Sequence, residues 1–87
     1  LGVEDHFPSY EAIIFPNPTE DILNIRTSAF EDVTYTLYDV QGQLVMQNKL
    51  LAEQTPIQLA HLAAGGYSLV LNNSIQKLKT IRLIKTH

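Results

Sequence analysis

The chain has 87 residues, no cysteine and a formal net charge of −3, with 45% hydrophobic and 17% charged residues. This length and composition are typical of one folded domain and exclude both a second core and a disordered chain. The absence of cysteine excludes disulfides, thiolate metal sites and a cysteine nucleophile, and the apolar-rich residues 57–75 are too interrupted for a membrane-spanning helix.

Residues 1–11 mix glycine, proline, serine and charged residues without a hydrophobic period, which is typical of a linker. The chain begins at Leu1 rather than methionine, and no basic stretch followed by an apolar stretch marks a signal peptide. We therefore expect a piece of a longer precursor, in which residues 1–11 connect upstream sequence to a folded domain at residues 12–87.

The first strand is expected at residues 12–15, and the motif Phe15-Pro16-Asn17-Pro18 ends it. A proline fixes its own φ at about −65° and restricts the preceding residue to extended conformations. Because two prolines flank a single residue, neither a helix nor a regular strand ladder continues through this segment. The motif therefore predicts a rigid corner at the start of the folded domain.

Residues 21–27, 32–39 and 43–50 are expected to form the next three strands. In the second of these strands, the side chains expected to face the core are Val33, Tyr35 and Leu37. They alternate with threonines, which are expected on the other face. Asp39 begins and Gly42 ends a four-residue sequence that is typical of a type I turn followed by a residue with positive φ. The second and third of these strands are therefore predicted to form a hairpin.

Further strands are expected at residues 55–59, 67–71 and 76–85. Between the first two, the spacing of the apolar residues predicts one helical turn that places Leu62 in the core. Seven strands spaced by about 8–12 residues, with turn sequences between them and no long helix, are typical of a β-sandwich. We therefore expect a single immunoglobulin-like antiparallel β-sandwich of about seven strands.

The last expected strand carries apolar side chains on both faces, with Leu78 and Ile84 on one face and Ile81 and Leu83 on the other. It is also basic on an acidic body, because residues 45–87 hold five basic residues and one acidic residue. The preceding part of the chain holds eight acidic residues and one arginine. Two interpretations remain open: an edge strand that lysines protect from association, or a recognition segment.

No constellation of catalytic or metal-binding residues is visible. The histidines His6, His61 and His87 have no metal-ligand spacing, and no serine lies in a nucleophile motif. The acid pairs at residues 20–21 and 31–32 lack the ligand ladder of a calcium site and are interpreted as solvated charge. We expect no enzyme activity, no cofactor and no metal. The acidic net charge, with no tyrosines interleaved with basic residues, also argues against nucleic-acid binding.

Several short motifs occur in a fixed order along the chain. The proline corner is followed by the Leu-Tyr-Asp-Val-Gln-Gly sequence of residues 37–42, then by a Gly-Tyr pair, and a lysine-bearing apolar strand closes the chain. The motif residues are Phe15, Pro16, Asn17, Pro18, Asp39, Gly42, Gly66 and Tyr67. In this order, over residues 15–85, they resemble the type A C-terminal sorting domain of the type IX (Por) secretion system of Bacteroidetes. Phe15 stands where tyrosine is commoner in that family.

The resemblance implies a secretion signal rather than a catalyst. It implies that the domain passes through the periplasm with a covalently linked upstream cargo protein, is read by the outer-membrane translocon and is removed by a surface sortase. The cargo then resides at the cell surface or outside the cell. Cleavage is expected within residues 1–11, where Gly2 and Ser9 keep the backbone open to a protease.

The resemblance further implies that the terminal strand is the part the translocon recognises. The implied recognition residues are Lys77, Lys79, Ile81, Arg82, Leu83, Ile84 and Lys85. An edge strand has unpaired backbone groups that a partner extends by strand addition. Lys79, Arg82 and Lys85 are expected to discourage self-association and to suit an acidic receptor groove.

The alternative function is a fibronectin-type or carbohydrate-binding β-sandwich module retained on a surface enzyme. Such modules stack sugars on exposed aromatic side chains. The chain has no tryptophan, and Tyr35 and Tyr67 alternate with aliphatic residues, which predicts core positions for both. Tyr38 and Tyr10 are the remaining candidate platforms.

Overall fold

The computed structural model describes residues 11–86, which form seven β-strands and no helix. The strands are β1 (Ile13–Phe15), β2 (Ile22–Arg26), β3 (Thr34–Asp39), β4 (Leu44–Lys49), β5 (Gln54–Gln58), β6 (Gly65–Asn72) and β7 (Lys77–Lys85). All seven predicted strands are present, and their ends differ from the prediction by no more than two residues. Over the described range, no helix is long and apolar enough to cross a membrane.

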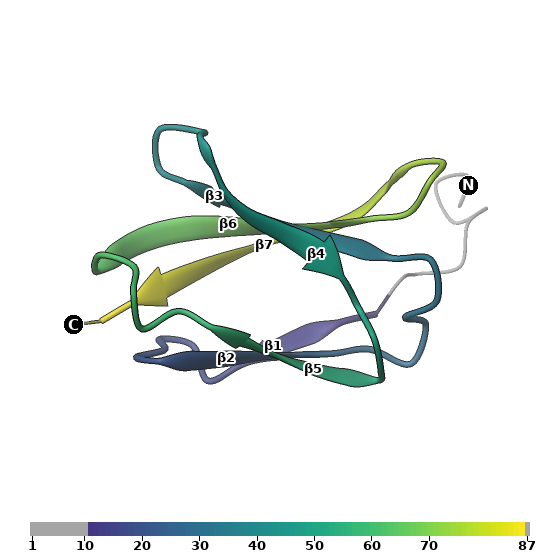
Figure 1. Cartoon of the computed structure of the whole chain (residues 1–87), viewed down its shortest axis with the longest axis horizontal. Coiled ribbons are helices and arrows are strands. Elements are labelled where there is room, and N and C mark those ends of the chain that lie inside the picture. Colours follow the sequence, from purple (N-terminus) through teal and green to yellow (C-terminus); the bar gives the residue numbers. More distant parts are fainter. Residues whose placement is uncertain (1–10, 87) are drawn as a thin grey trace, which may run out of the picture.

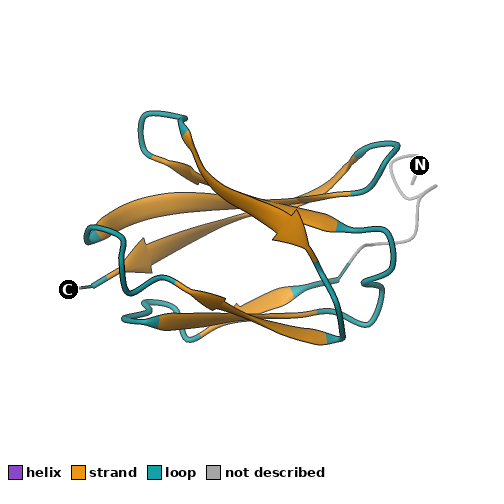
Figure 2. Ribbon diagram, in the orientation of Figure 1, coloured by secondary structure: helices purple, strands orange, loops and turns teal. Residues whose placement is uncertain are grey.

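The strands form two sheets that face each other, as Figure 1 shows. One sheet has three strands in the order β1-β2-β5, and the other has four in the order β4-β3-β6-β7. Every neighbouring pair of strands is antiparallel. The connections between the strands, both within a sheet and between the two layers, are all loops and turns (Figure 2). The predicted antiparallel β-sandwich is therefore confirmed.

The inward side chains of both sheets form the core. Leu23 and Ile25 of β2 are fully buried on one side, and Leu37 of β3 with Leu69 and Leu71 of β6 is fully buried on the other. Alternate residues of a strand point to opposite faces of its sheet, so these residues, spaced by two, share the inner face. Each buried aliphatic side chain stabilises the fold by about 1.5–3 kcal/mol, and this burial holds together a domain that has no disulfide.

The tyrosines occupy the faces that the alternation predicts. Tyr35 and Tyr67 are buried, whereas Tyr38 is half-buried on the opposite face of β3. The Tyr67 hydroxyl donates a hydrogen bond of 2.6 Å to the carbonyl of Ala63. This bond joins β6 to the loop that precedes it.

The turn between β3 and β4 has the predicted geometry. The Gly42 N–H donates to the Asp39 carbonyl at 3.0 Å, and Gly42 has a φ of 83°. Asp39 Oδ1 accepts hydrogen bonds from the N–H groups of Gln41 and Gln43, each at 2.9 Å. A short acceptor is therefore needed at the first position and a glycine at the last.

Two details differ from the sequence-based expectation. Leu62 lies in a single hydrogen-bonded turn, in which its N–H donates to the Leu59 carbonyl at 2.9 Å, and it is half-buried against the core without forming a helix. Leu78 also packs against the core rather than facing outward with Ile84. The β6–β7 register shifts between Leu71 and Asn72, and such a bulge changes which face the neighbouring side chains take.

Burial raises the pKa of the Tyr35 hydroxyl above its ordinary value of 10.0. The folded state thus favours the neutral phenol, so its contribution to stability is complete below pH 10 and is lost as the pH rises through the raised pKa. Between about pH 8 and about pH 11, we expect the unfolding free energy of the wild type to fall relative to that of Tyr35→Phe, which has no hydroxyl to ionise. Urea unfolding of both proteins at each pH measures it. A difference that stays constant contradicts the assignment.

Candidate functional site

The terminal strand β7 lies at the edge of the four-stranded sheet and pairs only with β6 within that sheet. With nine residues it is the longest strand of the described chain. The predicted edge position of this strand is therefore confirmed. Because an edge strand has one row of backbone N–H and C=O groups that no neighbouring strand pairs, what covers this row decides what can bind there.

Side chains along β7 alternate between the core and solvent. Leu83 and Lys85 are each only 1% exposed, whereas Ile84 between them is 55% exposed and Arg82 is also exposed. The expectation that Lys85 faces an acidic receptor is therefore wrong for the folded domain. Lys85 lies two residues after a core leucine, and the period of a strand places both on the inner face.

The other predicted recognition residues divide in the same way. Lys77 is exposed, and its neighbour Asn72 across the ladder places it on the outer face of the sheet. Lys79 and Ile81 are half-buried on the inner side, opposite Leu71 and Leu69 of β6. Of the basic side chains on β7, only Lys77 and Arg82 are thus fully open to a partner.

The proline corner lies against the C-terminal part of β7. Both prolyl bonds, Phe15–Pro16 and Asn17–Pro18, are cis. The Asn17 side chain accepts a hydrogen bond from the Ile84 N–H at 3.1 Å through Oδ1 and donates one to the Arg82 carbonyl at 3.2 Å through Nδ2. The side-chain amide of Asn17 thus pairs with the edge of β7 in the way that a backbone peptide group of a neighbouring strand would.

Thr19 continues this contact toward the end of the chain. Its N–H donates to the Ile84 carbonyl at 2.9 Å, its carbonyl accepts from the Thr86 N–H at 2.8 Å, and it forms a parallel bridge with Lys85. Thr19 is fully buried, and its hydroxyl donates to the Ile22 carbonyl at 2.9 Å. Thr19 is not among the residues predicted from the sequence, because a threonine after a proline has no distinctive signal.

A further bond holds the corner to the three-stranded sheet. The Asn24 side chain of β2 donates to the Phe15 carbonyl at 3.3 Å. We refer to residues 15–19 as the corner segment and to the bonds that Asn17 and Thr19 make with β7 as the clamp. The clamp joins residues that lie 65 to 67 positions apart in the sequence.

The remaining motif residues lie away from the clamp. Asp39 and Gly42 form the β3–β4 turn, and Tyr67 is a core residue of β6. A Cβ added at Gly66 would lie 3.6 Å from Val40, an ordinary contact, so space does not require glycine there. The adjacent Gly65 has a φ of 149°, which favours glycine strongly. The conformational need for glycine at this site is thus at Gly65, which is not one of the motif residues.

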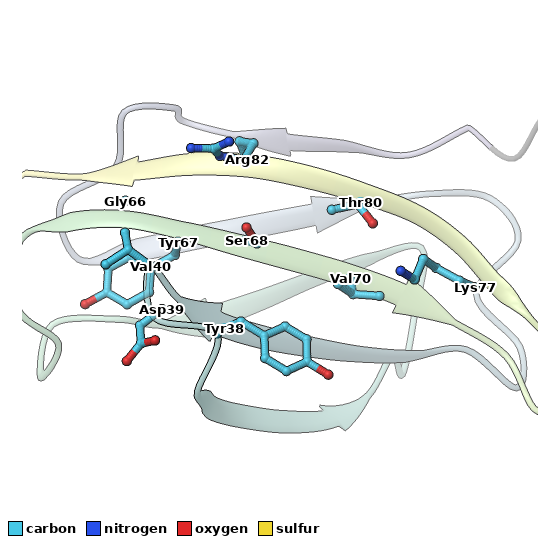
Figure 3. Close-up of a pocket in the computed structure, with 11 residues that line it drawn as sticks. Tyr38, Asp39, Val40, Gly66, Tyr67, Ser68, Val70, Lys77, Thr80 and Arg82 are labelled. Carbon is cyan, nitrogen blue, oxygen red and sulfur yellow. The ribbon is translucent and has the colours of Figure 1, made fainter.

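A groove of about 510 Å³ runs over the outer face of the four-stranded sheet. Tyr38 of β3, Val70 of β6, and Thr80 and Arg82 of β7 line it, as does Lys77 (Figure 3). Asp39, in the β3–β4 turn, also contributes to the lining, so the groove has basic groups on β7 and an acidic group on the turn.

The described residues contain neither a group of metal ligands nor the expected cleavage residues. Within residues 11–86, no three histidine or acidic side chains gather as metal ligands would. His61 is exposed in its turn. The expected cleavage residues Gly2 and Ser9 lie outside the described residues, as do His6, Tyr10 and His87.

The family model described as "secretion system C-terminal sorting domain" matches residues 13–86 of the chain. The chain belongs to this family. The domain is accordingly a type IX secretion sorting signal, which directs export across the outer membrane to the cell surface or the extracellular space. The match begins at β1 and includes both the corner segment and β7.

A solved structure of PorZ, an essential bacterial surface component of the type IX secretion system of Porphyromonas gingivalis, is similar to this chain with a TM-score of 0.72. The similarity covers 87% of this chain and 11% of the PorZ chain, at 17% sequence identity. At this identity the likeness concerns the fold alone. The search of curated protein sequences found no match.

The clamp predicts a measurable effect at a single amide. In Asn17→Ala, the Ile84 N–H loses its acceptor, so we expect its hydrogen exchange to rise by about 10-fold or more. Because Asn17 is exposed, the free energy of unfolding should fall by only about 1 kcal/mol. Asn48→Ala is the matched control, since within residues 11–86 the Asn48 side chain bonds the neighbouring Lys49 N–H and no other group. Unchanged Ile84 exchange in Asn17→Ala would contradict the clamp.

The burial of Lys85 predicts that its substitution acts on stability. Lys85→Glu places an opposite charge in an enclosed position, and we expect a loss of about 3 kcal/mol or more. Lys77→Glu, at the exposed start of the same strand, should change stability by no more than about 0.5 kcal/mol. Thermal or urea unfolding of the two variants measures both effects. Equal losses would mean that Lys85 is not enclosed in solution.

Proposed function

We propose that this domain is the removable address of an exported cargo protein. Residues 1–11 form the linker to the cargo and contain the processing site, and residues 12–87 form the folded signal. The protein crosses the periplasm, the type IX translocon reads the folded domain, and a surface sortase cuts within the linker. The family match over residues 13–86 is the observation that carries this proposal.

Recognition is proposed to take place on β7. Two features of the structure support this assignment: the strand lies at a sheet edge, and its outward side carries the exposed basic residues Lys77 and Arg82. Leu83 and Lys85, which the sequence analysis included, are enclosed and support recognition by holding the strand in place. Ile84 is exposed, but its backbone is taken up by the clamp.

A reporter enzyme fused ahead of residues 1–87 tests the proposal in a bacterium that has the type IX system. We expect the fusion to reach the cell surface or the medium, and the same reporter without the domain to stay inside the outer membrane. Mass spectrometry of the exported reporter should find its C-terminus within residues 1–11. Export without the domain contradicts the sorting function, and an exported reporter that keeps residues 12–87 contradicts removal.

A truncation is a less specific test than a point substitution. Deleting residues 77–87 should also retain the reporter, but it removes the core residue Leu83 and all of β7 from the sandwich. Loss of export in that variant therefore reports on the whole fold. Point substitutions on the outward side of β7 distinguish recognition from folding.

A further inference from the structure

The outward backbone groups of β7 fall into two parts. The clamp binds the N–H and C=O of Ile84 and the C=O of Arg82. In an antiparallel ladder, alternate residues turn both of their backbone groups to the same side. The Arg82 N–H and both backbone groups of Thr80 therefore also face away from β6, beyond the reach of the clamp.

These three groups form an open stretch with defined limits. No hydrogen bond within residues 11–86 closes them, and Thr80 and Arg82 are both exposed. On one side, the register shift between Leu71 and Asn72 ends the regular ladder. On the other side, Asn17 begins the clamp. Along the described part of β7, an incoming strand thus finds open backbone groups from the Thr80 N–H to the Arg82 N–H.

The other sheet edges are less suited to strand addition. β5 carries Pro56, which has no N–H to offer, and β1 has only three residues. β4 has a register shift near its start, and at its end the Lys49 N–H is bonded to the Asn48 side chain. The open stretch of β7 is therefore the edge at which a partner strand meets the fewest obstacles.

Charge indicates the chemistry of the partner. β7 contains Lys77, Lys79, Arg82 and Lys85 and no acidic residue. The exposed members, Lys77 and Arg82, line the outer groove together with Thr80 (Figure 3). An extended segment paired with Thr80 and Arg82 would lie beside this groove, where acidic side chains find two basic neighbours.

We propose that the outward edge at Thr80 and Arg82 is a strand-addition site for an extended acidic segment of the secretion machinery. The clamp keeps the rest of the β7 edge closed and so sets the register of the incoming strand. This inference rests on the proposed sorting function and names the site and the chemistry through which β7 is read.

Thr80→Pro in the reporter fusion is the direct test. Proline removes the outward N–H and places its ring on the open edge, while the ladder to β6 does not use that N–H. Lys49→Pro is the matched control, because the Lys49 N–H also faces outward, on the opposite edge of the same sheet. We expect export to fall by about 10-fold or more for Thr80→Pro and to stay within about 2-fold of wild type for Lys49→Pro. Export of Thr80→Pro at the wild-type level overturns the proposal.

A second variant keeps the test decisive if Thr80→Pro does not fold, which thermal unfolding of the purified fusion reveals. The double variant Lys77→Glu/Arg82→Glu reverses the two exposed charges and leaves the core unchanged. It should also lower export about 10-fold, whereas Lys77→Arg/Arg82→Lys should keep it near wild type. Normal export of the charge-reversed double variant overturns the acidic partner.

The fusion without residues 12–87 distinguishes failure of the sorting function from failure of the strand-addition site. If that fusion is exported, the sorting function itself is wrong. If it is retained while Thr80→Pro and the charge-reversed variant are exported normally, the sorting function stands and the strand-addition site is wrong.

Discussion

A sheet that does not close into a barrel leaves unpaired backbone groups along each edge, and this domain satisfies or blocks them differently at each one. β1 is short, β5 carries Pro56, and β4 is irregular. At β7 a side chain takes the place of a strand: the Asn17 amide pairs with Arg82 and Ile84 as a peptide group would. This one replacement ties the end of β7 to the segment that follows the first strand.

The clamp makes the two ends of the folded chain one structural unit. Asn17 and Thr19 come directly after the first strand, and the groups that they bind belong to the last strand. The end of β7 is therefore fixed only when the sandwich has formed between them. A machine that reads this strand in its clamped form therefore reads a folded domain.

Within β7, the period of the strand separates two roles. Leu83 and Lys85 point into the sandwich and attach the strand to it, while Lys77 and Arg82 point outward beside the groove. A basic strand therefore presents fewer charges than its sequence suggests. Of the four basic residues on β7, Lys77 and Arg82 are exposed, whereas Lys79 is half-buried and Lys85 is buried.

The sequence by itself determined the sandwich, because period-two alternation, the Asp39 to Gly42 turn and the proline corner are local signals that tertiary contacts reinforce. An ordered set of motifs, rather than chemistry visible in any one residue, identified the family of the chain, and the recognition role of β7 remains a prediction from that resemblance. Only the tertiary structure decided that Lys85 is enclosed, that Leu78 turns inward and that Thr19 is part of the site. The period of β7 already places Lys85 on the face of Leu83, but its burial depends on the packing of the two layers. The positions of Leu78 and Thr19 depend on a bulge and on hydrogen bonds between residues more than 60 positions apart, and no local pattern encodes such contacts.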